Sequence, residues 1–297
     1  MRVKLSGFAD EVSSSLETQI EATRALGWPL LDLRTIEGGN VVDVSDELFE
    51  EAAGRLSEAQ LGVSSFGSAL ANWGRSVEIP LNEEVAQLRR AAKRMRAIGT
   101  TYLRVMSYRM PKNAPVGGLP ELEREILFRL RRFAEVAEDE GIVCLHENCE
   151  TWGGQSVEHT LRIIEATRSD AFRLVFDTGN PVGLPDVRGE GPYRRQDALE
   201  FYESTKEHIA QVHIKDGRWN GSEVEYTLPG EGEARIPELL ESLRRDGYDG
   251  VISIEPHTAM VYHDPDRVAG PERRWSAYIE YGRRLEGLLG TDEVVDR

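Results

Sequence analysis

Four side chains that can bind a metal ion stand at the ends of four short apolar runs. They are Glu147, Asp177, His213 and Glu255, at the ends of IVCLHE, FRLVFD, IAQVH and VISIE. Because side chains alternate between the two faces of a strand, each donor shares a face with the residue two positions before it. The spacings of 30, 36 and 42 residues leave room for one helix between consecutive runs. The pattern predicts one donor per strand end, which is how a parallel barrel assembles a divalent-metal site.

Three carboxylates and one imidazole form a hard, mixed oxygen and nitrogen site. Such donors favour one divalent metal ion, with Mn²⁺ preferred and Mg²⁺, Co²⁺ or Zn²⁺ as alternatives, and the lack of thiolate ligands argues against structural zinc. The ion can polarise a carbonyl and stabilise an enediolate while a carboxylate moves a proton beside it. Glu147 and Glu255 come from the fifth and eighth predicted strands, so they could flank a bound sugar on opposite faces. We therefore predict that these two residues are the catalytic acid/base pair.

Composition narrows the classes of protein to consider. A chain of 297 residues fits one large α/β barrel or two ordinary domains. A net charge of −16 argues against nucleic acid as the partner, because binding phosphates needs clustered Lys and Arg. Cys144 and Cys149 lie on one extended segment, too far apart to form a disulfide easily. No signal-like or membrane-spanning apolar run is present, so we expect a cytoplasmic enzyme with no membrane partner.

Strand and helix patterns alternate along the whole chain. The predicted strands are VKLSGF, LLDLR, GVSSFG, TYLRVMS, IVCLHE, FRLVFD, IAQVHIKD and VISIEP. The predicted helices cover residues 16–26, 46–59, 81–98, 119–140, 157–167, 196–207, 236–245 and 273–288.

Eight βα units in one series predict the α/β class and a single (β/α)₈ TIM barrel over residues 1–290, with a polar C-terminal tail at 291–297. An open doubly wound sheet is the alternative, but no Gly-x-Gly-x-x-Gly follows the first strand. The connection over residues 181–195 is long for a βα loop and could fold over a ligand.

Further polar and aromatic residues near the strand ends are candidates for substrate binding. They are Asn180, Lys215, His257, Trp73, Trp152 and Arg34. Asn180 could bind a substrate hydroxyl or cap the turn after Asp177. Lys215 could meet a carbonyl or anionic oxygen or pair with a neighbouring acid, and Arg34 could bind an anion or form a rim salt bridge. The two tryptophans could stack on a sugar face or cover the end of the barrel, and His257 would lie at the mouth of the site.

The motifs resemble the xylose-isomerase-like TIM barrel superfamily, also described as the sugar phosphate isomerase/epimerase family. The resemblance runs from about Phe8 to Leu288, and its most specific segments are LHENCETWGGQSVEHTLRII, LVFDTGN, QVHIKD, PGEGEARIPELLESLRRDGYDG and ISIEPH. It implies the same barrel, the same four metal ligands and the same two glutamates as acid and base. The chain departs from the family where Asn180 and Cys149 replace common histidines, which leaves the substrate open.

The resemblance and the residues together predict a metal-dependent isomerase or epimerase of a ketose or related polyhydroxylated ketone. No basic phosphate loop is evident, so a free sugar or polyol ketone is expected as the substrate. The alternative is a dehydratase of a keto-inositol-like or dehydroshikimate-like substrate. An abasic-site DNA endonuclease shares the fold but needs more histidines than the six present. A non-catalytic sugar-binding barrel is the remaining alternative, and the resemblance implies a homodimer or homotetramer.

Overall fold

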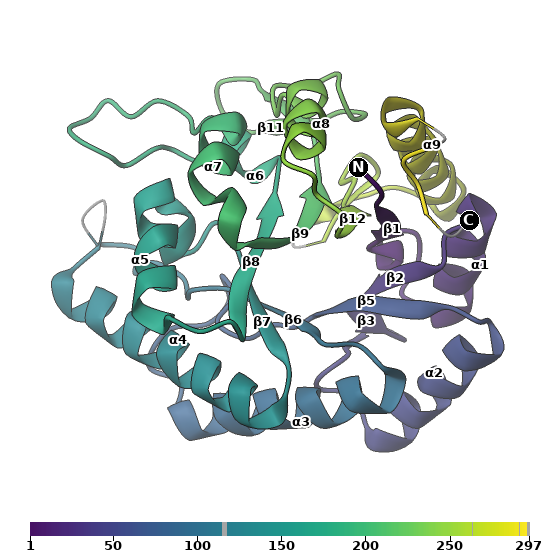
Figure 1. Ribbon diagram of the computed structural model, residues 1–297, viewed down its shortest axis with the longest axis horizontal. Helices are drawn as coiled ribbons and strands as arrows, with labels where there is room; N and C mark the ends of the chain where they lie inside the picture. The colour runs from purple at the N-terminus through teal and green to yellow at the C-terminus, as the bar shows by residue number, and fades with distance from the viewer. Residues whose placement is uncertain (115–117, 263, 291, 296–297) are drawn as a thin grey trace.

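Eight strands form a central barrel with helices packed around its outside (Figure 1). The computed structural model describes residues 1–114, 118–262, 264–290 and 292–295. The barrel strands are β1 (Lys4–Gly7), β2 (Leu30–Leu33), β5 (Gly62–Gly67), β6 (Tyr102–Val105), β7 (Val143–Glu147), β8 (Phe172–Asp177), β9 (Ile209–Ile214) and β12 (Val251–Ile254). The helices are α1 (Leu16–Leu26), α2 (Asp46–Glu58), α3 (Leu81–Ile98), α4 (Pro120–Glu140), α5 (Val157–Thr167), α6 (Asn180–Gly183), α7 (Ala198–Thr205), α8 (Ile236–Arg245) and α9 (Pro271–Leu289).

The strand order confirms the predicted (β/α)₈ TIM barrel. The sheet runs β1-β12-β9-β8-β7-β6-β5-β2, and every pairing within it is parallel. At the remaining seam, β1 contacts β2, and Ser6 Oγ donates a hydrogen bond to Asp32 Oδ2 at 2.8 Å. Because the strands are parallel, their carboxyl ends all meet at one face of the barrel.

Three short hairpins interrupt the βα pattern and were not predicted. They are β3 (Thr35–Ile36) with β4 (Gly39–Asn40), β10 (Gly217–Trp219) with β11 (Val224–Tyr226), and β13 (Met260–Val261) with β14 (Asp264–Val268). Each follows a barrel strand at its carboxyl end. They therefore add walls to the face of the barrel on which the predicted donors stand.

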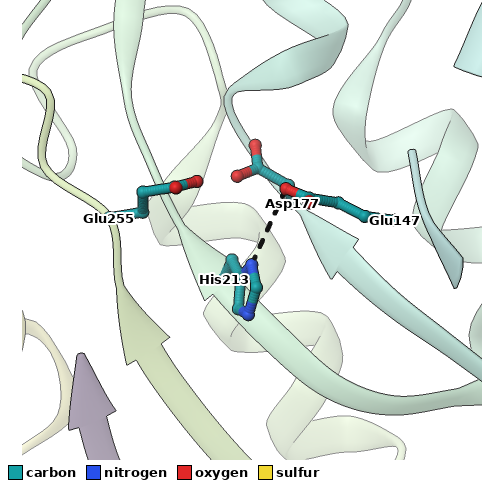
Figure 2. A group of neighbouring side chains, drawn as sticks. All are labelled: Glu147, Asp177, His213 and Glu255. Atoms are coloured by element: carbon teal, nitrogen blue, oxygen red, sulfur yellow. Dashed lines mark ion pairs between the residues drawn. The ribbon is translucent and has the colours of Figure 1, made fainter. Parts of the chain in front are cut away.

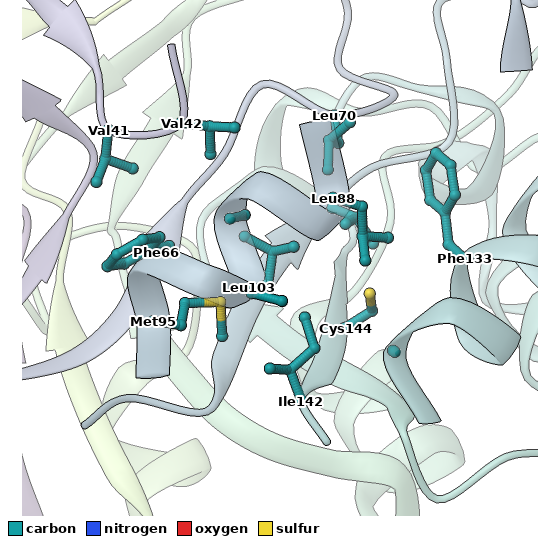
Figure 3. Close-up of a cluster of buried hydrophobic side chains, with 14 of the residues drawn as sticks. Val41, Val42, Phe66, Leu70, Leu88, Met95, Leu103, Phe133, Ile142 and Cys144 are labelled. Carbon is teal, nitrogen blue, oxygen red and sulfur yellow. The ribbon is translucent and has the colours of Figure 1, made fainter. Parts of the chain in front are cut away.

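The hydrophobic core lies between the barrel and the helices, in two clusters of buried side chains. Figure 3 shows part of one cluster, in which Leu88 and Met95 of α3 lie near Leu103 of β6 and Ile142. Leu88 and Met95 are seven residues apart, two helical turns, so they share one face of α3. Burying each such side chain contributes about 1.5–3 kcal/mol. This packing holds the strands whose ends carry the polar site.

The inside of the barrel is polar and hydrogen-bonded. The buried carboxylate of Asp32 accepts a hydrogen bond from Gln211 Nε2 at 2.8 Å, and Gln211 Nε2 also donates to Ser253 Oγ at 2.9 Å. Gln211 and Ser253 stand two residues before His213 and Glu255. Since residues two apart share a face, these contacts confirm that both donors belong to the inward-facing side of their strands.

Asp216, just after β9, ties the hairpin β10–β11 to the barrel. Its Oδ1 accepts the backbone N–H groups of Gly217 and Ala234 at 2.9 and 3.0 Å, and its Oδ2 accepts those of Gly230 and Gly232 at 2.8 and 3.0 Å. A Cβ at Gly232 would collide with Asp216 Oδ1, so only glycine permits this close approach. One buried carboxylate thus closes the segment 217–234 into a loop.

Three further expectations concern the termini, the cysteines and membrane insertion. Cys144 and Cys149 are both free and buried, so the expectation of no disulfide is confirmed. Val294 bridges Val3, while residues 291, 296 and 297 of the predicted tail lie outside the described residues. Within the described chain, no helix combines the length and apolar character needed to cross a bilayer.

We expect Asp216→Ala to lower the free energy of unfolding by about 2–4 kcal/mol, because four backbone donors lose a charged acceptor. Chemical denaturation followed by circular dichroism measures the change. Asp170→Ala, which removes an exposed carboxylate, should stay within about 0.5 kcal/mol of the wild type. Equal stability of the two variants would contradict the role assigned to Asp216.

Candidate active site and metal centre

The four predicted donors meet at the carboxyl-terminal face of the barrel (Figure 2). All four are buried, and one ligand atom from each of Glu147, Asp177, His213 and Glu255 lies within 4.8 Å of the others. Asp177 and His213 are direct partners in the register of β8 and β9. Glu147 on β7 and Glu255 after β12 stand at the two ends of the arc of four strands. The two glutamates therefore approach the centre from different sides.

His213 provides the test of whether the cluster fits a metal ion. Both of its ring nitrogens are buried without a hydrogen-bond partner, and Nδ1 lies 3.8 Å from Glu147 Oε1. The ring packs edge-on against Phe8, with 5.1 Å between the ring centroids. A buried imidazole with two unsatisfied nitrogens is costly, and a cation beside it would satisfy one of them. With three carboxylates next to it, this donor set fits a divalent metal site.

Asp177 and Glu255 share one buried ammonium group. Lys215 Nζ lies 2.9 Å from Asp177 Oδ2 and 3.0 Å from Glu255 Oε2. The other oxygen of Asp177 accepts the backbone N–H groups of Gly179 and Asn180 at 2.9 and 2.8 Å. Burial lowers the pKa of Lys215, but Asp177 and Glu255 outweigh burial and hold that pKa well above its usual value. The ammonium is therefore charged, and a metal ion bound by the cluster would share both carboxylates with it.

Each glutamate also pairs with its own arginine. Arg34 Nη1 lies 2.7 Å from Glu255 Oε1, and Arg104 Nη1 lies 3.3 Å from Glu147 Oε2. Asp10 holds Arg34 in turn through two hydrogen bonds of 2.9 Å. These contacts fix the orientation of both carboxylates, because a guanidinium is planar and donates in fixed directions.

The neighbouring cations keep both glutamates ionised despite burial. Burial raises the pKa of the Glu147 carboxyl, but Arg104 and His213 outweigh it and lower that pKa to about 2. The pKa of Glu255 is held well below its usual value in the same way, with Lys215 as the strongest opposing influence. For Asp177 burial prevails, and its pKa is raised. The cations around them therefore favour the carboxylate form of both glutamates.

A cavity of about 480 Å³ is lined by two of the four donors, Glu147 and Glu255. Its volume lies within the range of small-molecule sites. Its lining combines both glutamates with polar and aromatic side chains that include Asn180, Arg195, Lys215, Trp219, Tyr226 and His257.

Most of the predicted substrate-binding residues line this cavity. Trp73, Asn180 and His257 do so, and the buried Nδ2 of Asn180 has no hydrogen-bond partner. His257 is oriented by Glu11, which accepts its backbone N–H at 2.9 Å and contacts its Nδ1 at 2.8 Å. Arg34 and Lys215 also reach the cavity, and both form the salt bridges that were the alternative interpretation of their positions.

The structure corrects the prediction that Trp152 binds substrate. Its side chain is fully buried in the hydrophobic core and packs edge-on against His159, with 4.9 Å between the ring centroids. It begins a short 3₁₀ helix, Trp152–Gln155, which turns the chain back onto the barrel. Its ring therefore packs into the hydrophobic core and does not line the cavity.

The sequence pattern did not predict the aromatic residues that two of the hairpins supply. Trp219 and Tyr226 come from β10 and β11, and Tyr262 lies between β13 and β14, with its ring 3.7 Å from the guanidinium carbon of Arg34. A signal for the first hairpin was present in the dipeptide Asn220–Gly221, because Asn-Gly is typical of tight β-hairpin turns.

Comparison with known proteins agrees with this architecture. The profile of the family described as "Xylose isomerase-like TIM barrel" matches residues 20–280. An uncharacterized protein of Methanocaldococcus jannaschii is 34% identical over 134 residues, which cover 42% of this chain and 41% of that protein. An inosose dehydratase of Lacticaseibacillus casei is 26% identical over 141 residues, covering 42% of this chain and 44% of that protein. The matches thus span less than half the length of these curated relatives.

Solved structures resemble the whole chain. A D-tagatose 3-epimerase-like protein superposes with a TM-score of 0.72 at 20% identity, covering 97% of each chain. The IOLI protein, solved with a bound zinc atom, gives a TM-score of 0.72 at 16% identity, covering 96% of this chain and 98% of that one. At such identities the likeness shows the fold alone.

We expect the purified protein to bind one divalent ion per chain, and His213→Leu to weaken Mn²⁺ binding by about 100-fold or more, because the cluster loses its nitrogen donor. Isothermal titration calorimetry measures the affinity. His208→Leu, in the 3₁₀ turn before β9, is the matched control and should bind Mn²⁺ as the wild type does. Undiminished binding by His213→Leu would refute the assignment of this residue as a ligand.

Proposed function

This chain belongs to the xylose isomerase-like TIM barrel family, and on that premise we propose that it is a metal-dependent isomerase or epimerase of a ketose or related polyhydroxylated ketone. One observation carries the proposal. Two glutamates flank Asp177 and His213, and both glutamates line a cavity of about 480 Å³. A reaction that moves a proton on a carbon next to a carbonyl needs a positioned base on that side and an acid to complete the transfer.

In this proposal Glu147, Asp177, His213 and Glu255 hold one divalent ion, with Mn²⁺ preferred for a hard donor set of this kind. When bound, the ion supplies the charge that polarises the substrate carbonyl. One glutamate removes the proton on the carbon next to the carbonyl and later loses it to solvent. The other takes up a proton from solvent and returns it to the carbon from the opposite side. Arg34 and Arg104 hold one oxygen of each glutamate. The second oxygen of Glu255 lies 3.0 Å from Lys215 Nζ, and that of Glu147 lies 3.8 Å from His213 Nδ1.

A dehydratase acting on a keto-inositol-like or dehydroshikimate-like substrate is the second candidate. The similarity to an inosose dehydratase over 141 residues favours it. Elimination of water from a β-hydroxy ketone begins with the same proton removal, so the same glutamates would serve. The two reactions differ in the step after proton removal: the dehydratase expels water, whereas the isomerase or epimerase returns a proton.

DNA cleavage at abasic sites finds little support in the site. Among the described residues, the second group that could hold a metal ion, Glu11, Glu255 and His257, shares Glu255 with the first group. Its histidine is already hydrogen-bonded to Glu11 at 2.8 Å. The described residues therefore do not offer the larger histidine cluster that such an endonuclease needs.

The proposed reaction is tested by incubating the metal-loaded protein in D₂O with ketoses, keto-inositols and hydroxypyruvate, each with Mn²⁺, Mg²⁺ or Co²⁺. NMR follows deuterium entry at the carbon next to the carbonyl, and ultraviolet absorbance follows loss of water. We expect deuterium exchange without elimination, and we expect chelation of the metal to stop it. Elimination would assign the protein to the dehydratases. Exchange that survives exhaustive metal removal would refute the metal-dependent mechanism.

Glu147→Gln and Glu255→Gln should each reduce turnover by about 10²–10⁴-fold at saturating metal, because each removes one proton-transfer group. Glu158→Gln, on the exposed face of α5, is the matched control and should retain full activity. Circular dichroism and a Mn²⁺ titration separate a loss of chemistry from a loss of fold or metal. Near-normal turnover in either glutamate variant would exclude that residue as acid or base.

A further inference from the structure

A second cavity, of about 520 Å³, adjoins the active-site cavity. The two cavities share four lining residues, Trp73, Glu150, Leu184 and Pro185. The remaining lining of the second cavity comes from the segment after β6, which includes Arg109 and Met110, from Thr151, Gly154 and Gln155 after β7, and from Val187 after β8. The available space therefore extends from the four donor side chains towards the side of the barrel formed by β5, β6 and β7.

The active-site cavity alone is large enough for the reacting part of a sugar. Small-molecule sites as a class span about 300–1,000 Å³, and this cavity already lies in that range. A single ketose placed on the metal cluster would leave the adjoining 520 Å³ without a ligand group. The space is therefore available to a part of the substrate that does not react.

The lining of the second cavity has the mixed character that sugar rings need. Met110, Leu184 and Val187 give it apolar surface, and the indole of Trp73 stands at the border of the two cavities. Arg109, Glu150 and Gln155 add polar groups. An apolar face with polar groups around it suits the C–H faces and hydroxyls of a pyranose.

The walls of the second cavity are held in place by hydrogen bonds between its two sides. Gln196 Nε2 donates to the carbonyl oxygen of Gly154 at 2.8 Å and to that of Pro185 at 3.1 Å. The backbone N–H of Val187 donates to the carbonyl oxygen of Gln155 at 3.3 Å. These bonds join the loop after β8 to the loop after β7. The space between them is therefore preformed, which lowers the entropic cost of binding a ligand there.

We propose that the second cavity is a subsite for a glycosyl unit, so that the preferred substrate is a glycosylated ketose and not a free monosaccharide. The proposal rests on the proposed function for the position of the reacting ketose. The ketose part lies over the four donor side chains, and the glycosyl unit lies between the loops after β7 and β8. The glycosidic linkage passes Trp73. The same arrangement explains why four residues border both cavities.

The test compares equilibrium binding of D-fructose, maltulose and isomaltulose to the Mn²⁺-loaded protein by isothermal titration calorimetry. The last two probes carry a glucosyl unit on fructose through different linkages. We expect at least one of them to bind about tenfold more tightly than D-fructose, the gain of one well-packed sugar face. Val187→Trp and Met110→Trp, which fill the second cavity from the segments after β8 and β6, should abolish this preference and leave D-fructose binding unchanged.

A wild-type protein that binds neither glucosyl fructose more tightly than D-fructose, or that binds none of the three, would overturn the subsite. A preference that survives in both filled variants would also overturn it. Deuterium exchange measured on the same samples separates this result from the proposed reaction. A glycosyl preference without exchange would retain the subsite and refute the reaction, whereas exchange of D-fructose without a glycosyl preference would do the opposite.

Discussion

Three carboxylates are buried together at one end of the barrel, and their neutralisation is the constraint on which the site depends. Removing one partner of a buried ion pair costs about 3–5 kcal/mol, because the other charge is left without compensation. The three carboxylates are neutralised by Arg34, Arg104 and Lys215, which come from the ends of β2, β6 and β9. Strands that carry none of the four donors are therefore as necessary to the site as those that do.

The first strand contributes an apolar spacer between these charges. Phe8, just after β1, lies 4.4 Å from the guanidinium carbon of Arg34 and 5.4 Å from that of Arg104, measured to the ring centroid. The same ring forms a T-shaped contact with His213, with 5.1 Å between the ring centroids. Cations stack favourably on aromatic faces, so one buried ring keeps two arginines apart while each binds its own glutamate. The barrel must close for this ring to reach the cluster.

The regular helices and strands of this structure could be predicted from the sequence, whereas the hairpins and the contacts between distant segments could not. Residues 81–98, 157–167 and 236–245 form helices with the predicted bounds, because helical periodicity and flanking caps are local signals. The four donors could be predicted because the alternation of side chains along a strand is a local signal too. The pairing of Lys215 with two acids, and the depth of Trp152, depend on contacts between distant segments. The hairpin residues were missed because strands of three residues carry almost no periodic signal.

The hairpin β10–β11 has one consequence for how this site can change. It supplies Trp219 and Tyr226 to the cavity wall, yet Asp216 fastens its segment to the barrel only through backbone N–H groups. Apart from the glycines at 217 and 232, which leave no room for a side chain, the anchor does not depend on which side chains the segment carries. A lineage could therefore exchange the hairpin side chains and diversify its ligands while the four buried donors stay in place, and a protein engineer could graft a different hairpin onto the same barrel.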